Sequence, residues 1–161
     1  MKILVAENEP LIAIMLEEAL QSAGHAVIGP SASVEEALAA AKISTPELAL
    51  LDINLLAGGS GIDLAHALLS LYGTPSIFVS GNPYQAREAK DAALGFISKP
   101  FRIAAVITAI SVARAIIAGD VPYKIPPGFE VFPGAVAPMV AAAGVRHLHS
   151  GPRHGQCREG Q

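Results

Sequence analysis

Short apolar runs alternate along the chain with longer segments in which apolar residues recur every three or four positions. The short runs are typical of buried parallel strands, and the longer segments are typical of helices that cover a sheet. Five strands are predicted, at Ile3–Ala6, Ala26–Gly29, Leu48–Asp52, Ser76–Ser80 and Gly95–Ser98. Five helices are predicted, at Pro10–Ala23, Val34–Lys42, Gly61–Tyr72, roughly Tyr84–Ala92 and Arg102–Ala118. This strict alternation predicts repeated strand–helix units around a parallel sheet.

Residues at the helix ends agree with this division of the chain. Pro10 suits the first turn of a helix, and Gly24 suits the position just after its last turn. Ser33 followed by Glu36 has the spacing of a capping box at the start of the second helix.

The composition changes near Gly119, where Pro and Gly become frequent and the helical period is lost, apart from a short helical pattern at 137–143. We therefore predict one compact domain over residues 1–119 and a Pro/Gly-rich, largely disordered extension over residues 120–161. The extension holds His147, His149, His154 and Cys157, whose spacings match no standard metal site. It also shows neither a helix-turn-helix pattern nor a catalytic motif.

The totals exclude several classes of function. The chain of 161 residues is 52% hydrophobic and 16% charged, which allows a sizeable core. Its net charge of -3 argues against nucleic-acid binding as the main activity. No apolar run reaches membrane-spanning length, and the start of the chain is unlike a signal peptide. With a single cysteine, Cys157, the sequence indicates a cytoplasmic protein that uses no internal disulfide and no membrane.

Polar side chains gather at the carboxyl ends of the predicted strands, where open α/β sheets bind their ligands. Glu7, Asn8 and Glu9 follow the first strand, Asp52 ends the third, Ser80 ends the fourth and Lys99 follows the fifth. Carboxylate oxygens suit Mg²⁺, and a lysine with a hydroxyl suits a phosphoryl group. Asp52 is the only acid on the central strand, so it is the natural nucleophile for an aspartyl-phosphate.

The segments "ILVAENEP", "LALLDINL", "IFVSGNP" and "GFISKPF" together resemble the receiver domain of bacterial two-component response regulators. The resemblance covers residues 1 to about 118, and it implies a (βα)5 doubly wound five-stranded sheet in the flavodoxin-like order 2-1-3-4-5. It also implies phosphorylation by a sensor histidine kinase or a phosphotransfer protein.

Roles for individual residues come from this resemblance. It makes Asp52 the phosphoacceptor, Ser80 the switch hydroxyl and Lys99 the partner of the phosphoryl oxygens. It assigns Mg²⁺ to Glu7, Asn8, Asp52 and the backbone carbonyl of Asn54. Phe96 takes the aromatic position whose rotamer reports activation, and the Lys99–Pro100 bond is often cis in such domains.

Two positions depart from the usual receiver pattern. Asn8 stands where a second acid usually contacts the metal, and loss of that charge predicts weaker Mg²⁺ binding. Gly81 follows Ser80, as in a subgroup of stand-alone receivers, and "LLAGGSGID" is similar to receivers of bacterial general-stress signalling.

Alternative roles stay open for several residues. Asn8 has two equal interpretations, as a metal ligand and as the N-cap of the first helix. Glu9 is interpreted as an acid that favours the helix dipole, and Phe96 as either a switch or a core aromatic. His25 and His66 are interpreted as ordinary surface histidines.

The fifth helix is apolar over more than one stripe, so both of its sides need cover. One side is expected to pack on the sheet. The other is expected to meet a partner, for example a second copy through the face made by helix four, strand five and helix five. The competing interpretation is cover by the chain's own segment "GFEVFPGAVAPMV".

The leading hypothesis is a single-domain response regulator that signals through protein contacts and performs only its own phosphorylation and dephosphorylation. The alternative is a pseudo-receiver that binds partners without phosphorylation, because Asn8 weakens the metal site. An aspartate-nucleophile phosphatase is less favoured, since Asn54 stands where such enzymes place a second acid.

Overall fold

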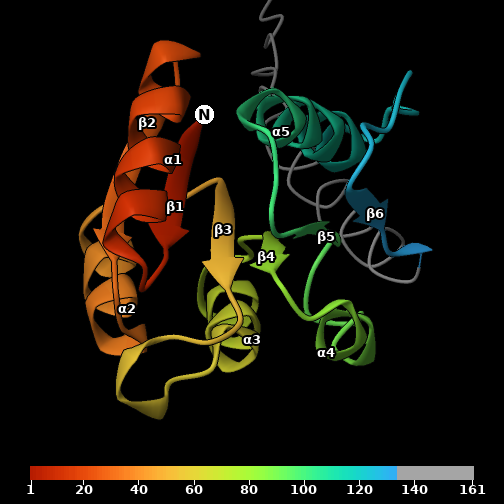
Figure 1. Cartoon of the computed structure of the whole chain (residues 1–161). Coiled ribbons are helices and arrows are strands. Elements are labelled where there is room, and N and C mark those ends of the chain that lie inside the picture. Colours follow the sequence, from red (N-terminus) through yellow and green to blue (C-terminus); the bar gives the residue numbers. More distant parts are fainter. Residues whose placement is uncertain (134–161) are drawn as a thin grey trace, which may run out of the picture.

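The computed structural model describes residues 1–133 of the chain. Six strands form one sheet in the order β2-β1-β3-β4-β5-β6, and the first five are parallel to one another (Figure 1). The strands are β1 (Lys2–Ala6), β2 (Ala26–Ser31), β3 (Leu48–Asp52), β4 (Ser76–Ser80), β5 (Gly95–Ser98) and β6 (Phe129–Val131). The order 2-1-3-4-5 is therefore confirmed, and a sixth strand extends it.

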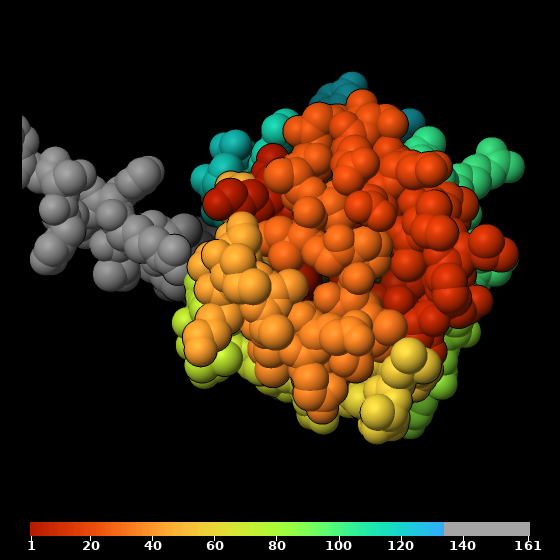
Figure 2. All heavy atoms as spheres, turned by 90° about the vertical axis from the view of Figure 1, so that its left-hand side faces the viewer, coloured from red at the N-terminus to blue at the C-terminus, as the bar shows by residue number. Residues whose placement is uncertain are grey.

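The helices alternate with the parallel strands as predicted. They are α1 (Pro10–Ser22), α2 (Val34–Ile43), α3 (Gly61–Tyr72), α4 (Pro83–Glu88) and α5 (Ile103–Ala118), and a single 3-10 turn, η1 (Leu56–Gly58), follows β3. Figure 2 looks onto the side of the molecule that the N-terminal part of the chain, drawn in red and orange, mainly forms.

Two apolar layers cover the two faces of the sheet. Because side chains alternate along each strand, Ile3 and Val5 of β1 pack with α1 and α5, whereas Leu4 and Ala6 pack with α2 and α3. The central strands β3 and β4 are buried at every position, as expected for parallel strands that are covered on both faces.

Local signals in the sequence account for the helix ends. Ser33 Oγ accepts a hydrogen bond from Glu36 N at 3.2 Å, so the predicted cap is confirmed, and Glu36 Oε2 accepts one from Ala32 N at 2.9 Å, one residue before the position that a capping box uses. Gly24 follows α1 with a positive φ of 84°, which glycine adopts at little cost.

Helix α4 is shorter than predicted. It ends at Glu88 rather than near Ala92, because the chain turns and Ala92 N donates to Ala89 O at 3.0 Å. This turn lets Leu94 N reach Ser76 O at 2.8 Å, where the pairing of β5 with β4 begins. The prediction of four further helical residues was wrong.

Strand β6 lies beyond the predicted domain boundary at residue 119. It runs antiparallel to β5, and its Phe129 and the following Phe132 are buried, in the α1–α5 layer and the opposite layer respectively. The chain's own segment therefore contributes to the cover of α5, which was one of the two interpretations. The four residues His147, His149, His154 and Cys157 and the helical pattern at 137–143 lie outside the described residues.

Candidate functional site

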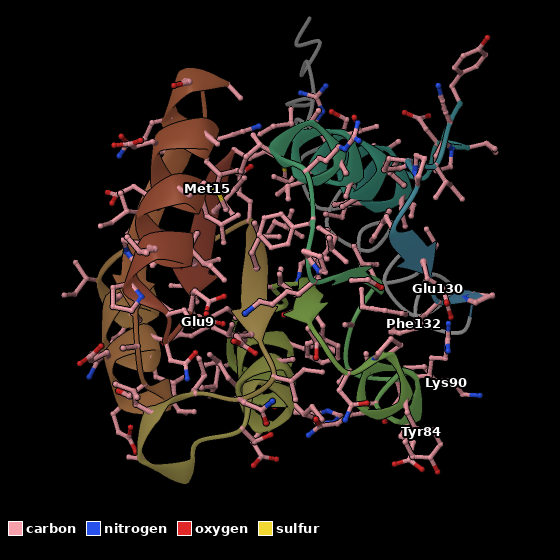
Figure 3. The ribbon with its side chains drawn as sticks, in the orientation of Figure 1. Glu9, Met15, Tyr84, Lys90, Glu130 and Phe132 are labelled. Atoms are coloured by element: carbon pink, nitrogen blue, oxygen red, sulfur yellow. The ribbon has the colours of Figure 1, made fainter. Side chains whose placement is uncertain are left out.

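Three of the predicted acids meet Lys99 at the carboxyl edge of β1, β3 and β5. Lys99 Nζ lies 2.9 Å from Asp52 Oδ2, 2.9 Å from Glu7 Oε2 and 3.3 Å from Glu9 Oε1 (Figure 3 labels Glu9). Glu7 and Asp52 are buried, while the Glu9 side chain is largely exposed. One lysine thus contacts three carboxylates, although it lies 90 positions after Glu9 in the sequence.

The backbone fixes the orientation of each carboxylate. Asp52 Oδ1 accepts a hydrogen bond from Asn54 N at 3.0 Å, and Glu7 Oε1 accepts one from Glu9 N at 3.0 Å. The second oxygen of each group then faces Lys99. This arrangement leaves Asp52 in one orientation at the end of the central strand.

Gly61 brings the loop after β3 close to Asp52. A Cβ at this position would lie 2.0 Å from the Asp52 carbonyl oxygen, so only glycine fits without movement of the backbone. Gly61 N donates to Ile53 O at 2.8 Å, and Asn54 pairs with Ser60 in an isolated bridge. The contacts fold residues 53–60 back onto the strand end that carries the candidate phosphoacceptor.

Ser80 lies at the end of β4, beside β3, and is buried. Its Oγ accepts a hydrogen bond from Asn82 N at 3.0 Å, and its carbonyl accepts one from Lys99 N at 2.9 Å. The backbone thus couples Ser80 directly to the lysine. The Lys99–Pro100 bond that follows is cis, as the resemblance implied.

The charges of the site perturb its pKa values. Burial lowers the affinity of Lys99 for its proton, but the hydrogen bond to Asp52 and the contact with Glu7 outweigh it and raise the pKa of Lys99 to about 12. Burial raises the pKa of Glu7 above its ordinary value, and the neighbouring charge of Asp52 adds to this rise, although Glu9 N and Lys99 oppose it. The protonated, charged form of Lys99 is therefore favoured, and the ionised form of Glu7 is disfavoured.

The oxygens of the site fit a hard divalent cation. One carboxylate oxygen each from Glu7, Glu9 and Asp52 lie within 4.8 Å of one another. Glu7 Oε2 is buried and contacts Lys99 Nζ at 2.9 Å, so a cation bound here would share this oxygen with the lysine. All donors in this set are oxygens, which Mg²⁺ prefers.

Glu9 is the third acid that the structure brings into the cluster, beside Glu7 and Asp52. Glu9 also occupies the N-cap position of α1, with no side-chain hydrogen bond to the helix, so the interpretation of Asn8 as the N-cap was wrong. Asn8 is half-buried next to the acids.

A hollow of about 450 Å³ opens beside the carboxylates, between α1 and the turn from β5 to α5. Its lining consists of Glu9, Ile12, Met15, Lys99, Pro100 and Phe101. Lys99 therefore contacts both the buried acids and an open space that an incoming group can enter.

Phe96 lies inside the protein, with 2% of its surface exposed. Its ring stacks on Phe132 at a centroid distance of 5.8 Å, and the guanidinium of Arg87 lies 5.5 Å from its centre. The residue is thus a core aromatic in this structure, in contact with the segment that follows β6.

Comparison with known proteins identifies the family. Residues 3–111 match the model of the response regulator receiver domain. The chain belongs to the response regulator receiver family. Phyllosphere-induced regulator PhyR of Methylorubrum extorquens is 40% identical over 114 residues, which is 70% of this chain and 43% of the relative.

Solved structures agree with this assignment. The receiver domain of PhyR from Erythrobacter litoralis is 34% identical, with a TM-score of 0.65 over 70% of this chain and 88% of that one. A mutant of the anti-anti-sigma factor PhyR from Bartonella quintana is 31% identical, with a TM-score of 0.62 over 70% of this chain and 47% of that one. The chain therefore spans less than half of the PhyR proteins of Methylorubrum and Bartonella, and its likeness to them lies in the receiver domain. Among residues 1–133, no helix is long and apolar enough to cross a membrane.

Proposed function

We propose that this receiver is the phosphorylated switch of a response regulator, with Asp52 as phosphoacceptor. The observation that carries the proposal is the position of Lys99 Nζ, 2.9 Å from both Asp52 and Glu7, on a residue whose backbone N donates to the carbonyl of the buried Ser80. A lysine held charged at this point neutralises the phosphoryl oxygens, while the Ser80 hydroxyl donates to one of them.

The phosphoryl group comes from a histidine kinase or a phosphotransfer protein. A carboxylate oxygen of Asp52 forms a bond to phosphorus while the phosphorus–nitrogen bond of phosphohistidine breaks, and the histidine nitrogen keeps that electron pair. Mg²⁺, when bound, offsets negative charge on the transferred group. Glu7 and Asp52 would hold it, with the backbone carbonyl of Asn54 and with either Asn8 or Glu9.

The output of the switch is contact with another protein. Support comes from the likeness to PhyR, since one of the similar structures is named an anti-anti-sigma factor. The similarity of "LLAGGSGID" to general-stress receivers points the same way. The proposed cellular setting is therefore cytoplasmic stress signalling.

A small phosphodonor such as acetyl phosphate tests this function. With Mg²⁺, we expect intact-mass analysis to show one added phosphoryl group on the wild type and none on Asp52→Asn. Ser80→Ala serves as the matched control, because it keeps the acceptor and should still take up the group. A folded wild type that gains no mass at any Mg²⁺ concentration would rule the proposal out.

A pseudo-receiver that acts without phosphorylation is the second candidate. Two observations favour it: Asn8 removes one negative charge, and Lys99 already binds the carboxylates that a metal would need. Asn8→Asp decides between the two, because we expect tighter Mg²⁺ binding and faster phosphorylation if residue 8 contacts the metal. Equal metal titrations for wild type and Asn8→Asp would show that it does not.

A further inference from the structure

Strand β6 occupies an edge of the sheet that would otherwise be open. β5 pairs with β4 on one side, and on the other side it pairs with β6 in the register Gly95–Val131, Phe96–Glu130 and Ile97–Phe129 (Figure 1). Hydrogen bonds extend the pairing at both ends, from Phe132 N to Leu94 O at 2.7 Å and from Ser98 N to Gly128 O at 3.0 Å. The free backbone groups of an edge strand bind a further strand readily, and here the chain supplies its own.

Side chains on both faces of the sheet hold this segment in place. Phe129 packs in the α1–α5 layer, and Phe132 stacks on Phe96 in the opposite layer. Glu130 lies on the α4 side, where Arg87 binds its carboxylate through two nitrogens at 2.7–3.1 Å (Figure 3 labels Glu130 and Phe132). The contacts define a pattern that the edge accepts: aromatic, acidic, aliphatic, aromatic.

Gly95 shows that the edge is shaped for a strand. A Cβ at Gly95 would lie 2.1 Å from Glu130 O and 3.0 Å from Phe129 Cε2, and its three nearest neighbours all belong to β6. The φ of Gly95 is not positive, so alanine is acceptable to its own backbone. The close approach of β6 is therefore the reason that glycine is required at this position.

Few residues attach the segment 129–132 to the rest of the protein. Only three residues form the ladder, and residues 119–128 that tether it to α5 include the exposed Val121, Tyr123 and Ile125. Besides this ladder, two buried side chains, Phe129 and Phe132, hold the segment. Local opening of such a short segment withdraws these two rings from the core layers and leaves the pairing of β1–β5 in place.

The edge is also connected to the phosphorylation site. Phe96 of β5 contacts Phe132 and Arg87, and Lys99 follows the last residue of this strand. Lys99 N in turn donates to Ser80 O. If Ser80 and Lys99 move toward a phosphoryl group, β5 is displaced with them, and β5 is the strand that pairs with β6.

We propose that the β5 edge, with Arg87 and Phe96, is a strand-binding site whose resident occupant is residues 129–132. Phosphorylation of Asp52 loosens this occupant, and an extended segment of another protein with the same aromatic–acidic–aliphatic–aromatic pattern replaces it. The phosphorylation step rests on the function proposed above. A second copy of the chain would offer the same four residues, but the resident segment is tethered next to the edge and therefore has the higher effective concentration. Another protein can outcompete it, because it adds contacts outside the β5 edge.

Two variants of the full chain separate the site from its occupant. Phe132→Ala weakens the resident segment and leaves the edge intact, so it should bind a labelled peptide of residues 128–133, GFEVFP, at least tenfold more tightly than the unphosphorylated wild type. Gly95→Ala blocks the edge for the resident segment and the peptide alike. It should bind no peptide, and its amides at 129–132 should exchange with deuterium at least tenfold faster than in the wild type.

The chemistry of the peptide and the effect of phosphorylation are tested in the same assay. Phe132→Ala should bind the peptide with lysine in place of glutamate at least fivefold more weakly, because Arg87 then repels it. Wild type treated with acetyl phosphate and Mg²⁺ should gain affinity for GFEVFP and lose amide protection at 129–132. Circular dichroism confirms that each variant is folded.

Each outcome bears on a separate part of the proposal. If folded Phe132→Ala does not bind GFEVFP, or Gly95→Ala keeps its amide protection, there is no strand-binding site. If Phe132→Ala binds but wild type carrying a phosphoryl group does not, the coupling is wrong. If wild type takes up no phosphoryl group, the proposed function fails while the Phe132→Ala result still decides the site. A phosphorylated dimer that the peptide dissociates would show that a second copy is the partner.

Discussion

Lys99 offers the sharpest test of the electrostatics of the site, through the substitution Lys99→Met. Methionine keeps most of the length of the side chain and removes its charge. The lysine contacts two buried carboxylates at 2.9 Å, and only 15% of its side chain is exposed. Its removal leaves Glu7 and Asp52 facing each other without a cation.

The size of the effect follows from the pKa of the amine. The interactions raise the pKa of Lys99 from an ordinary 10.5 to about 12. At about 1.4 kcal/mol for each unit of pH, this difference corresponds to about 2 kcal/mol of net stabilisation. Breaking a buried pair also leaves unpaired charges, at a cost of up to about 5 kcal/mol. We therefore expect Lys99→Met to lose at least about 2 kcal/mol of unfolding free energy at neutral pH.

The pH dependence gives the sign of the effect. Because the folded pKa of Lys99 is raised, its contribution to wild-type stability is complete below pH 10.5 and is lost as the pH rises through about 12. In Lys99→Met, the loss of unfolding free energy should be smaller in acid. The pKa of Glu7 is raised, so Glu7 takes up a proton as the pH falls and the repulsion between the two carboxylates is removed. Mg²⁺ should reduce the deficit too, since it replaces the missing positive charge.

Urea unfolding followed by circular dichroism measures these changes, in EDTA at neutral and mildly acidic pH and again with Mg²⁺. Lys90→Met is the matched control, because Lys90 is exposed and lies just after α4 (Figure 3), and it should change stability by less than about 0.5 kcal/mol. The reasoning is refuted if Lys99→Met is as stable as wild type at neutral pH. It is refuted equally if the deficit is the same in acid, which would indicate lost packing rather than lost charge.

Two further substitutions test how the fold positions the site. Gly61→Ala forces a Cβ against the Asp52 carbonyl, so it should cost at least about 2 kcal/mol and slow phosphorylation by acetyl phosphate, whereas Gly81→Ala meets nothing within 4 Å and should be neutral in urea unfolding. Equal stabilities of the two alanine variants would contradict this account. Ser33→Ala removes the cap of α2 and should lower the unfolding free energy by about 1 kcal/mol, with Ser33→Asp as the variant that restores it. A loss that Ser33→Asp does not recover would mean that the hydroxyl acts in some other way.

The parallel core was predictable because its signals are local. β3, β4, β5 and α3 have the bounds that the apolar pattern predicted, since continuous apolar runs and helical periods are direct consequences of burial. The end of α4 was not predictable, because the pairing of Leu94 with Ser76 across the sheet decides where the helix must turn.

Strand β6 was missed for a related reason. "FEVF" alternates as a strand should, but prolines flank it on both sides and the composition around it favours an extension without structure. Only the open edge of β5 and the absent side chain of Gly95 make this segment a strand. The information therefore lies in residues that are more than 30 positions away.

The candidate site was predictable in its members more than in its contacts. Glu7, Asp52, Ser80 and Lys99 were predicted to meet because parallel strands end at one edge. Whether Glu9 or Asn8 joins them depends on how α1 begins, and two polar residues before Pro10 leave that question open in the sequence.

Gly95 has a consequence for comparing this protein with its relatives. A single methyl group there is incompatible with the sixth strand, and the three atoms nearest to it all belong to that strand. Residue 95 thus works as a marker that can be read in any aligned sequence. Relatives with glycine there can carry a strand on this edge, from their own chain or another, and relatives with a larger residue should leave the edge bare or use it differently.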